Sequence, residues 1–353
     1  MRFLNFCIAI FIFSLKVDAQ PADYYSSATG LTGIALQQAL HNIIKNHQAQ
    51  SYASLYGHFQ VTDCKPNMVV WDMYSDVPGG TPAYIYHYNA GDECGNYSRE
   101  GDCYNREHSF PKSWFGGNIT PMYTDLFHLY PTDGYVNNRR ANYPYGEVGS
   151  ATWTSTNGSK VGSNTFPGYS GIVFEPVDEY KGDFARTYFY MAVRYYGQDG
   201  SWPGSPMHNG AQLKPWALNL LKTWHLQDSV SQKEIDRNDV VYEIQGNRNP
   251  FIDHPEFAWA IWGGLTAIEE LIEITGITVY PVPAIDHCFI SFSEPITTLP
   301  VSALFDPAGR QINISTSLDN GNIMIDTSDL PKGFYIIAIQ FENTNPIVAK
   351  IVK

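Results

Sequence analysis

The chain has 353 residues, with 44% hydrophobic, 14% aromatic and 16% charged residues and a formal net charge of −13 at pH 7. This length can bury a sizeable core and form two domains, and the composition argues against intrinsic disorder. The negative charge argues against a protein that holds nucleic acid through bulk positive charge. A nucleic-acid enzyme of this composition would need its basic groups at one cleft, or a metal ion.

The N-terminus predicts a secretory signal peptide over residues 1–19, with the mature chain beginning near Gln20. Arg2 gives a weak positive region, Phe3–Leu15 is mostly apolar, and Val17–Ala19 resembles a small-residue cleavage site. An ordinary buried N-terminal helix is the alternative. No other stretch approaches the roughly 18 apolar residues that a transmembrane helix needs.

Apolar residues at helical spacing predict the main helices, and turn residues mark the segments between them. Helices are expected within 30–48 (with Thr32 as N-cap), from Asp183 onward, over 213–226, and over 232–245 with a stop at Gly246. Val69–Tyr74 predicts a strand. Residues 85–170 are rich in Gly, Asn, Tyr and Pro with little period, so we expect this region to be loop-rich.

Removal of the signal peptide leaves Cys64, Cys94, Cys103 and Cys288. An exported protein can oxidise its thiols, and Cys94 and Cys103 bracket a Gly/Asn/Ser loop, so we predict a disulfide between them. Pairing of one of them with Cys64 is the alternative. No Cys/His spacing resembles a zinc site.

The C-terminal part changes to short β-like runs separated by turn residues, which suits a small β-sandwich. Residues 277–283 look like a linker or a first edge strand. We predict a catalytic domain over 20–275, a linker over 276–285 and a β-sandwich over 286–353. The predicted strands are Phe289–Phe292, Val301–Phe305, Ile323–Ile325, Phe334–Phe341 and Ile347–Val352.

The segment Asn105–Trp114 places Glu107 beside His108, and the segment Gly134–Asn142 follows with an amide and two arginines. A carboxylate suits a divalent cation, a His can deprotonate water, and arginines can bind phosphate. Neighbours on a strand point to opposite faces, so this pair must lie at a strand end or in a turn to serve one site. A surface pair or a partly buried structural His is the alternative.

Several ordered segments resemble the endonuclease I family of secreted, non-specific nucleases with a ββα-metal site. They are Tyr104–Trp114, Asp125–Pro131, Gly134–Tyr143, Ala185–Met191 and Ile244–Phe251, within roughly residues 25–262. The resemblance implies an α+β domain with a helical core, Glu107 and Asn137 as Mg²⁺ ligands, and His108 as general base. Mn²⁺ and Ca²⁺ are alternative cofactors. It further implies hydrolysis of DNA, and of RNA as well, leaving 5′-phosphate ends.

Periplasmic members of the family carry a cysteine-rich insert with an arginine that contacts phosphate, whereas here the link from Trp114 to Asp125 is short and contains no Arg. That role is then unfilled or passes to another residue. Arg140 is the first candidate for a phosphate-binding or structural arginine, and Arg186 the second. For Arg186 we favour a buried ion pair, and for His128 a structural role is at least as well supported as a hydrogen bond to Asn137 or phosphate.

The segments Val301–Arg310, Asp329–Ile337 and Ala349–Lys353 resemble the C-terminal sorting domain read by the type IX secretion system. An adhesive or carbohydrate-binding sandwich is the alternative. The resemblance implies an extracellular or cell-surface protein whose partner is the type IX machinery, and no stable protein partner is predicted. Two other functions remain open: a catalytically degenerate surface binding protein, and an enzyme that acts mainly on RNA.

Overall fold

The computed structural model describes residues 21–263, 277–305, 311–331, 333–341 and 347–353. The predicted signal peptide and the predicted domain boundary at residue 275 lie outside the described residues. None of the described helices combines the length and the apolar character that a bilayer-spanning segment requires.

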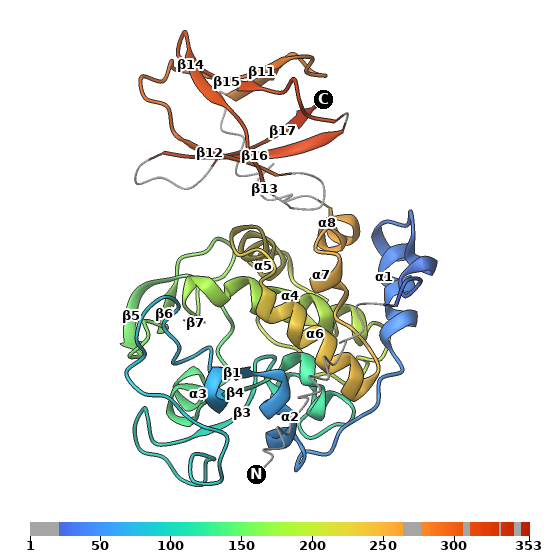
Figure 1. Cartoon of the computed structure of the whole chain (residues 1–353), viewed down its shortest axis with the longest axis vertical. Coiled ribbons are helices and arrows are strands. Elements are labelled where there is room, and N and C mark those ends of the chain that lie inside the picture. The colour runs from blue at the N-terminus through green and yellow to red at the C-terminus, as the bar shows by residue number, and fades with distance from the viewer. Residues whose placement is uncertain (1–20, 264–276, 306–310, 332, 342–346) are drawn as a thin grey trace, which may run out of the picture.

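The first unit, residues 21–263, has a helical core. Its helices are α1 (Gly33–Ile44), α2 (Leu55–Thr62), α3 (Gly134–Arg140), α4 (Lys181–Arg194), α5 (Pro215–Gln227), α6 (Gln232–Gln245), α7 (Pro250–Asp253) and α8 (Phe257–Trp262). Helix α4 is buried along its whole length and packs against α1 and α5 (Figure 1). Helix α6 begins with a capping box of Ser231 and Glu234 and ends at Gly246, whose φ is 79°. The four predicted helices are thus confirmed.

A β-hairpin and a short helix follow one another below this core in Figure 1. Strand β3 (Tyr104–His108) pairs antiparallel with β4 (Leu129–Asp133), with Glu107 opposite Tyr130. Strand β4 leads directly into α3, where the Asp133 carboxylate accepts a hydrogen bond from the Val136 amide as N-cap. The remaining strands are β5 (Val148–Thr154), β6 (Lys160–Asn164) and β7 (Ile172–Glu175) in one sheet, and the short pairs β1 (Cys64–Lys65) with β2 (Val69–Val70) and β8 (His208–Asn209) with β9 (Gln212–Leu213).

Two sequence-based predictions were wrong in part. The strand predicted over Val69–Tyr74 ends at Val70, because the Asp72 carboxylate accepts hydrogen bonds from the Tyr74 amide and the Ser75 hydroxyl and turns the chain. Residues 85–170 are more ordered than expected, since they include the hairpin, α3 and two strands of the three-stranded sheet.

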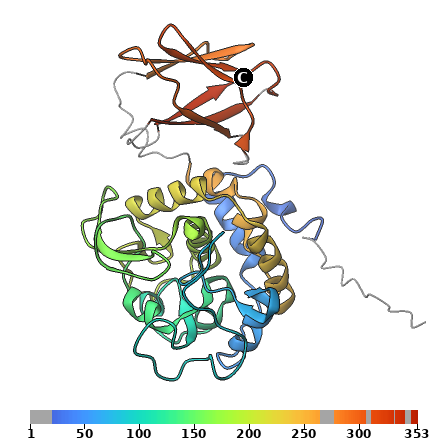
Figure 2. The same cartoon turned by 60° about the vertical axis from the view of Figure 1, so that its left-hand side comes forward.

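The second unit is a β-sandwich of two four-stranded antiparallel sheets, as predicted (Figure 2). One sheet has the order β10-β11-β15-β14 and the other β13-β12-β16-β17. Its strands are β10 (Ile277–Tyr280), β11 (His287–Phe292), β12 (Val301–Phe305), β13 (Gln311–Ile312), β14 (Thr316–Asp319), β15 (Asn322–Asp326), β16 (Phe334–Gln340) and β17 (Ile347–Val352). Part of the segment predicted as a linker, 276–285, is thus edge strand β10. Strands β13 and β14 were missed. Together the two units confirm the α+β class.

Candidate active site

Glu107 and His108 are the last two residues of β3, the strand end at which neighbouring side chains can serve one site. Glu107 is 3% exposed. Its Oε1 accepts hydrogen bonds from the Tyr74 hydroxyl at 3.1 Å and from Arg140 Nη1 at 3.0 Å. Burial raises the pKa of Glu107, and the positive charge of Arg140 opposes that effect.

Arg140, on the last turn of α3, is 1% exposed and is surrounded by acceptors. Besides Glu107, its guanidinium donates to the carbonyl oxygens of His108 at 3.1 Å and Ser109 at 2.6 Å. The guanidinium carbon lies 4.9 Å from the centroid of the Tyr145 ring. Arg140 therefore ties α3 to the end of β3 and holds the Glu107 carboxylate, which favours the structural one of its two predicted roles.

The His108 ring has a defined tautomer. Its Nε2 lies 3.0 Å from the Tyr123 carbonyl oxygen, and because a carbonyl can only accept, Nε2 must carry the hydrogen. The neutral ring then has its lone pair at Nδ1. Burial, and after it the charge of His128, lowers the pKa of His108 to about 3, below the near-neutral value that its residue type alone suggested.

Asn137 lies on α3, three residues before Arg140, and is partly exposed. Its Nδ2 donates to Asn105 Oδ1 at 2.7 Å, which fixes the amide so that Oδ1 is the end left to meet a ligand. Asn105 is on β3, two residues before Glu107, so both side chains lie on the same face of the strand. Sequence reasoning missed Asn105 and Tyr74. Asn105 could have been found from this alternation, whereas Tyr74 carried no local signal.

Three polar residues of the segments Asp125–Pro131 and Ala185–Met191 have structural roles. The buried Asp125 carboxylate accepts hydrogen bonds from the hydroxyls of Tyr190 and Tyr195, each at 2.8 Å. His128 is buried, and its Nε2 lies 2.6 Å from the Met122 carbonyl oxygen. Arg186 is fully buried and pairs with Glu234, with Nη2 2.8 Å from Oε2, so it joins α4 to α6.

The predicted disulfide between Cys94 and Cys103 is present, and Cys64 and Cys288 are free thiols. The bridge lies against the start of α3. The Gly134 amide donates to the Cys103 carbonyl at 2.9 Å, and a Cβ added to Gly134 would come within 2.6 Å of Cys94 Sγ. Only glycine allows α3 to begin this close to the bridge.

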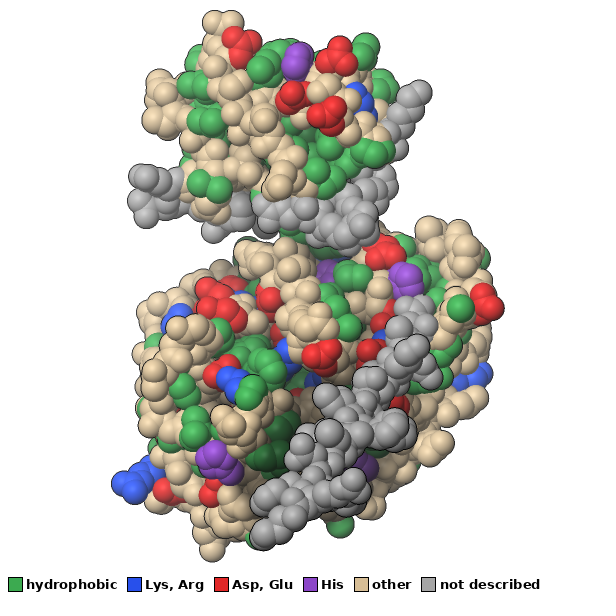
Figure 3. Space-filling model, in the orientation of Figure 1, with side chains coloured by type: hydrophobic (Ala, Val, Ile, Leu, Met, Phe, Trp, Pro, Cys, Tyr) green, Lys and Arg blue, Asp and Glu red, His purple; other side chains and the backbone are tan. Residues whose placement is uncertain are grey.

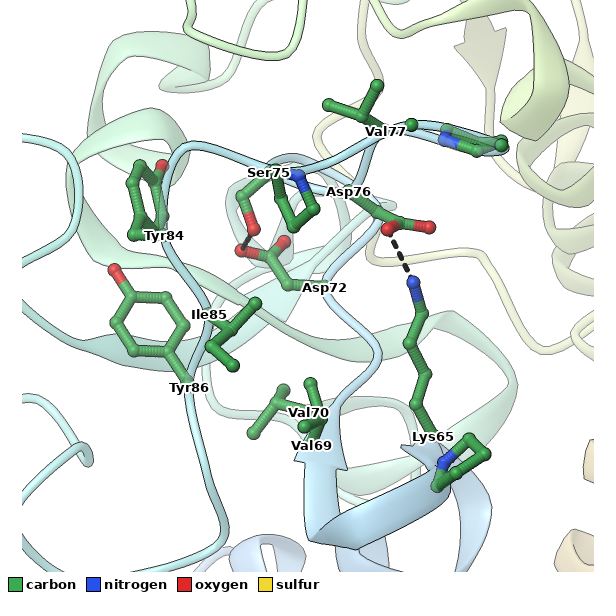
Figure 4. Close-up of a pocket in the computed structure, with 15 residues that line it drawn as sticks. Lys65, Val69, Val70, Asp72, Ser75, Asp76, Val77, Tyr84, Ile85 and Tyr86 are labelled. Atoms are coloured by element: carbon green, nitrogen blue, oxygen red, sulfur yellow. Dashed lines mark hydrogen bonds and ion pairs between the residues drawn. The ribbon is translucent and has the colours of Figure 1, made fainter.

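A cavity of about 340 Å³ lies between residues 65–86 and is lined by both polar and apolar side chains (Figure 4). The predicted site residues Glu107, His108, Asn137 and Arg140 are not among its lining. Asp72 in this cavity is buried, which raises its pKa to about 7, and it accepts a hydrogen bond from the Asp133 amide at 2.8 Å. Asp72 thus fixes Asp133, the N-cap residue of α3.

Within the described residues, no cluster of three or more His, Cys, Asp or Glu side chains could hold a metal. The predicted pair of Glu107 and Asn137 falls outside this definition, because it has one carboxylate and one amide. These two residues supply hard oxygen atoms, the donor type that Mg²⁺ and Ca²⁺ prefer.

Comparison with known proteins gives matches for both units. A family model described as Endonuclease I matches residues 32–256, and one described as Secretion system C-terminal sorting domain matches residues 278–353. An extracellular ribonuclease of Bacillus amyloliquefaciens is 39% identical over 255 residues, covering 69% of this chain and 80% of that protein. An extracellular ribonuclease of Bacillus subtilis is 37% identical over 265 residues, covering 71% and 83%. A periplasmic deoxyribonuclease of Aeromonas hydrophila is 27% identical over 133 residues, covering 37% and 48%.

Proposed function

The chain belongs to the endonuclease I family. From that premise we propose that it is a magnesium-dependent endonuclease that hydrolyses nucleic acids with low sequence specificity. Its C-terminal sorting domain and its extracellular relatives make it a secreted nuclease. The observation that carries the proposed mechanism is the pairing at the end of β3. There, a carboxylate held by Arg140 lies beside an imidazole whose tautomer is fixed by Tyr123.

Glu107 and Asn137 would hold the cation. Arg140 and Tyr74 orient the Glu107 carboxylate, and Asn105 orients the Asn137 amide, so both oxygen ligands are positioned before any ligand arrives. When bound, Mg²⁺ supplies Lewis-acid stabilisation of the charge that develops on the phosphate. Mn²⁺ and Ca²⁺ have compatible donor preferences and remain alternatives.

His108 acts as the general base. Its Nδ1 takes a proton from a water molecule, while Nε2 keeps its hydrogen and donates it to the Tyr123 carbonyl, which holds the ring in position. The water oxygen forms a bond to phosphorus as the P–O3′ bond breaks. The products are a 5′-phosphate and a 3′-hydroxyl, whose proton comes from solvent.

Both DNA and RNA are proposed as substrates. The two relatives that cover about 70% of this chain carry the name extracellular ribonuclease, whereas the deoxyribonuclease covers 37% of it. This difference favours an enzyme that acts mainly on RNA as the second candidate function. The adhesion alternative is less well supported, because a retired site has no need for Glu107, His108 and Asn137 together.

We also propose that the sorting domain is read by the type IX secretion machinery. The match over residues 278–353 covers the β-sandwich from its first strand, β10, to the end of the chain.

The purified full chain tests the proposed activity directly. Plasmid DNA and a structured RNA are incubated with Mg²⁺ or with EDTA, and His108→Ala and His87→Ala are compared with the unchanged protein. We expect Mg²⁺-dependent cleavage that falls by about 10²–10⁴-fold in His108→Ala, the usual contribution of a general base. His87 is exposed, so His87→Ala should keep full activity. Initial rates on the two substrates decide the preference for RNA or DNA.

Cleavage by His108→Ala at the unchanged rate would show that another group is the base. A folded protein that cleaves neither substrate with any divalent metal would instead support the surface binding protein. Equal cleavage with Mg²⁺ and with EDTA would refute metal dependence.

A further inference from the structure

Positive charge without a carboxylate partner lies beside His108. The chain carries a net charge of −13, and on the face shown in Figure 3 Lys and Arg side chains lie singly among acidic and neutral ones. Most arginines of the described residues form ion pairs with carboxylates: Arg99, Arg140, Arg186, Arg237 and Arg248. Arg106 and Lys112, which flank His108 in the sequence, form no ion pair within the described part of the chain.

Arg106 is clamped between two tyrosine rings. Its guanidinium carbon lies 3.9 Å from the centroid of the Tyr52 ring and 4.4 Å from that of Tyr56, and Nη1 donates to the Tyr52 carbonyl at 3.0 Å. Its Nε is buried and has no hydrogen-bond partner. Arg106 is two residues before His108 on β3, so both side chains lie on the same face. Aromatic rings orient a guanidinium but leave its charge in place.

Lys112 is exposed at the start of the 3-10 helix Lys112–Phe115, which follows the His108 segment. Its Nζ lies 5.4 Å from the centroid of the Tyr123 ring and 3.2 Å from Asn118 Oδ1. An amide oxygen does not neutralise an ammonium group, so this charge is also unpaired.

The rings beneath the two cations form one stack with the proposed base. The Tyr52 and Tyr123 rings are 4.5 Å apart with planes at 16°, and the Tyr123 and His108 rings are 5.1 Å apart with planes at 13°. Arg106 therefore rests on the first ring of this stack and Lys112 on the second. The tyrosine rings that hold both charges next to the His108 imidazole lie outside β3 and α3, the elements that carry Glu107 and Asn137.

We propose that Arg106 and Lys112 bind phosphate groups of the nucleic-acid backbone on the His108 side of the site. An unpaired, partly exposed guanidinium and an exposed ammonium are groups that bind backbone phosphates. They take the place of the arginine that is missing from the link between Trp114 and Asp125. This inference rests on the proposed function, because it names the substrate contacts of the same site.

Binding without turnover tests the proposal. Fluorescence anisotropy with a labelled single-stranded RNA oligonucleotide in EDTA gives the dissociation constant of the full chain as a function of NaCl concentration. Each phosphate contact on a single strand adds about 0.7 to the slope of log Kd against log [NaCl]. We expect Arg106→Met and Lys112→Met each to weaken binding at low salt and to lower this slope by about 0.7. Arg106→Lys should keep the slope.

Lys45→Met is the matched control. Lys45 Nζ also bonds an asparagine oxygen, that of Asn42 at 2.7 Å, and also forms no ion pair in the described structure, but it lies at the end of α1. Lys45→Met removes the same charge as Lys112→Met. Because Lys45 lies at the end of α1 and not beside His108, Lys45→Met should leave the slope unchanged. If Lys112→Met and Arg106→Met give the slope of Lys45→Met, the proposal is wrong. If Arg106→Met does not fold, the comparison of Lys112→Met with Lys45→Met still tests the proposal, because Lys112 is exposed.

The readout separates this inference from the proposed function. Oligonucleotide binding that depends on Arg106 and Lys112, in a protein that never cleaves with Mg²⁺, would refute the nuclease and keep the phosphate site. Cleavage with Mg²⁺ together with unchanged slopes in both variants would keep the nuclease and refute the phosphate site.

Discussion

Asn105 controls which atom Asn137 presents to a ligand. Because Asn105 Oδ1 accepts from Asn137 Nδ2 at 2.7 Å, the Asn137 amide cannot flip without losing that hydrogen bond. A partner that orients a metal ligand in this way commonly contributes about 10–100-fold in metal affinity or activity. Asn105 would therefore act through Asn137 without touching substrate.

We expect Asn105→Ala to raise the Mg²⁺ concentration that gives half-maximal cleavage by about 10-fold, with activity at saturating Mg²⁺ largely kept. A Mg²⁺ titration of the initial rate measures this. Asn138, an exposed neighbour on α3, provides the control, and Asn138→Ala should not change the titration. An unchanged midpoint in Asn105→Ala would show that Asn137 needs no such support or is not a ligand.

Candidate site residues could be proposed from the sequence where they lie in short motifs. Glu107, His108 and Asn137 occupy two motifs, and the structure brings both motifs to the hairpin and α3. The hydrogen-bond partners of Glu107 could not all be predicted in this way. Tyr74 reaches its carboxylate from a turn 33 residues away, and such a contact depends on how the whole chain folds.

At the level of elements, α3 depends on a close approach to the Cys94–Cys103 disulfide. A Cβ at Gly134 would lie 2.6 Å from Cys94 Sγ and 2.8 Å from Tyr97 Cδ1, distances that real contacts do not allow. Since Asp133 and Gly134 begin the helix that carries Asn137, any shift here moves the proposed metal ligand.

Gly134→Ala should therefore destabilise the protein by about 1–3 kcal/mol, the usual cost of overpacking a buried position. It should also lower the cleavage rate. The midpoint of urea unfolding measures the first effect and the initial rate the second. In Gly95→Ala, where a Cβ meets nothing within 4 Å, both values should stay the same. A stable and fully active Gly134→Ala would show that α3 can shift without cost.

Helices were predicted more successfully than the central strands, for a physical reason. Helices α5 and α6 bury one face, so the 3.6-residue period is visible in their sequences. In contrast, all five residues of β4 are buried, and β3 has no regular alternation, so the two-residue period that marks a strand is missing. In the sandwich, short β13 and β14 were too brief or too polar to be recognised.

The stability of the whole molecule should depend on pH through histidines buried in neutral form. His225 is a defined case: its Nε2 lies 3.0 Å from the Pro255 carbonyl, and its Nδ1 lies 3.2 Å from Arg186 Nη1. It must donate to the carbonyl and accept from the arginine, which leaves no place for a second hydrogen. Burial, and then the charge of Arg186, lowers the pKa of His225 to about 3 from its ordinary 6.5.

Between about pH 3 and pH 6.5, the unfolded chain thus binds a proton at His225 that the native protein does not bind. The free energy of unfolding should rise with pH in this window, and the contribution should be lost as pH falls below 6.5. We expect His225→Gln to reduce that slope by up to about 1.4 kcal/mol per pH unit. Urea unfolding at several pH values measures it. The exposed His87 again gives the control, and an unchanged slope in His225→Gln would contradict the expectation.

The disulfide has a consequence for the cell that makes this protein. Thiols stay reduced in the cytosol and can be oxidised after export. Before export, then, Cys94 and Cys103 do not form the bridge against which α3 begins. The helix carrying Asn137 acquires that support only once the chain has left the compartment that holds the chromosome and the messenger RNA. Location and covalent chemistry together would delay assembly of the site, so that the producer's own nucleic acids are spared.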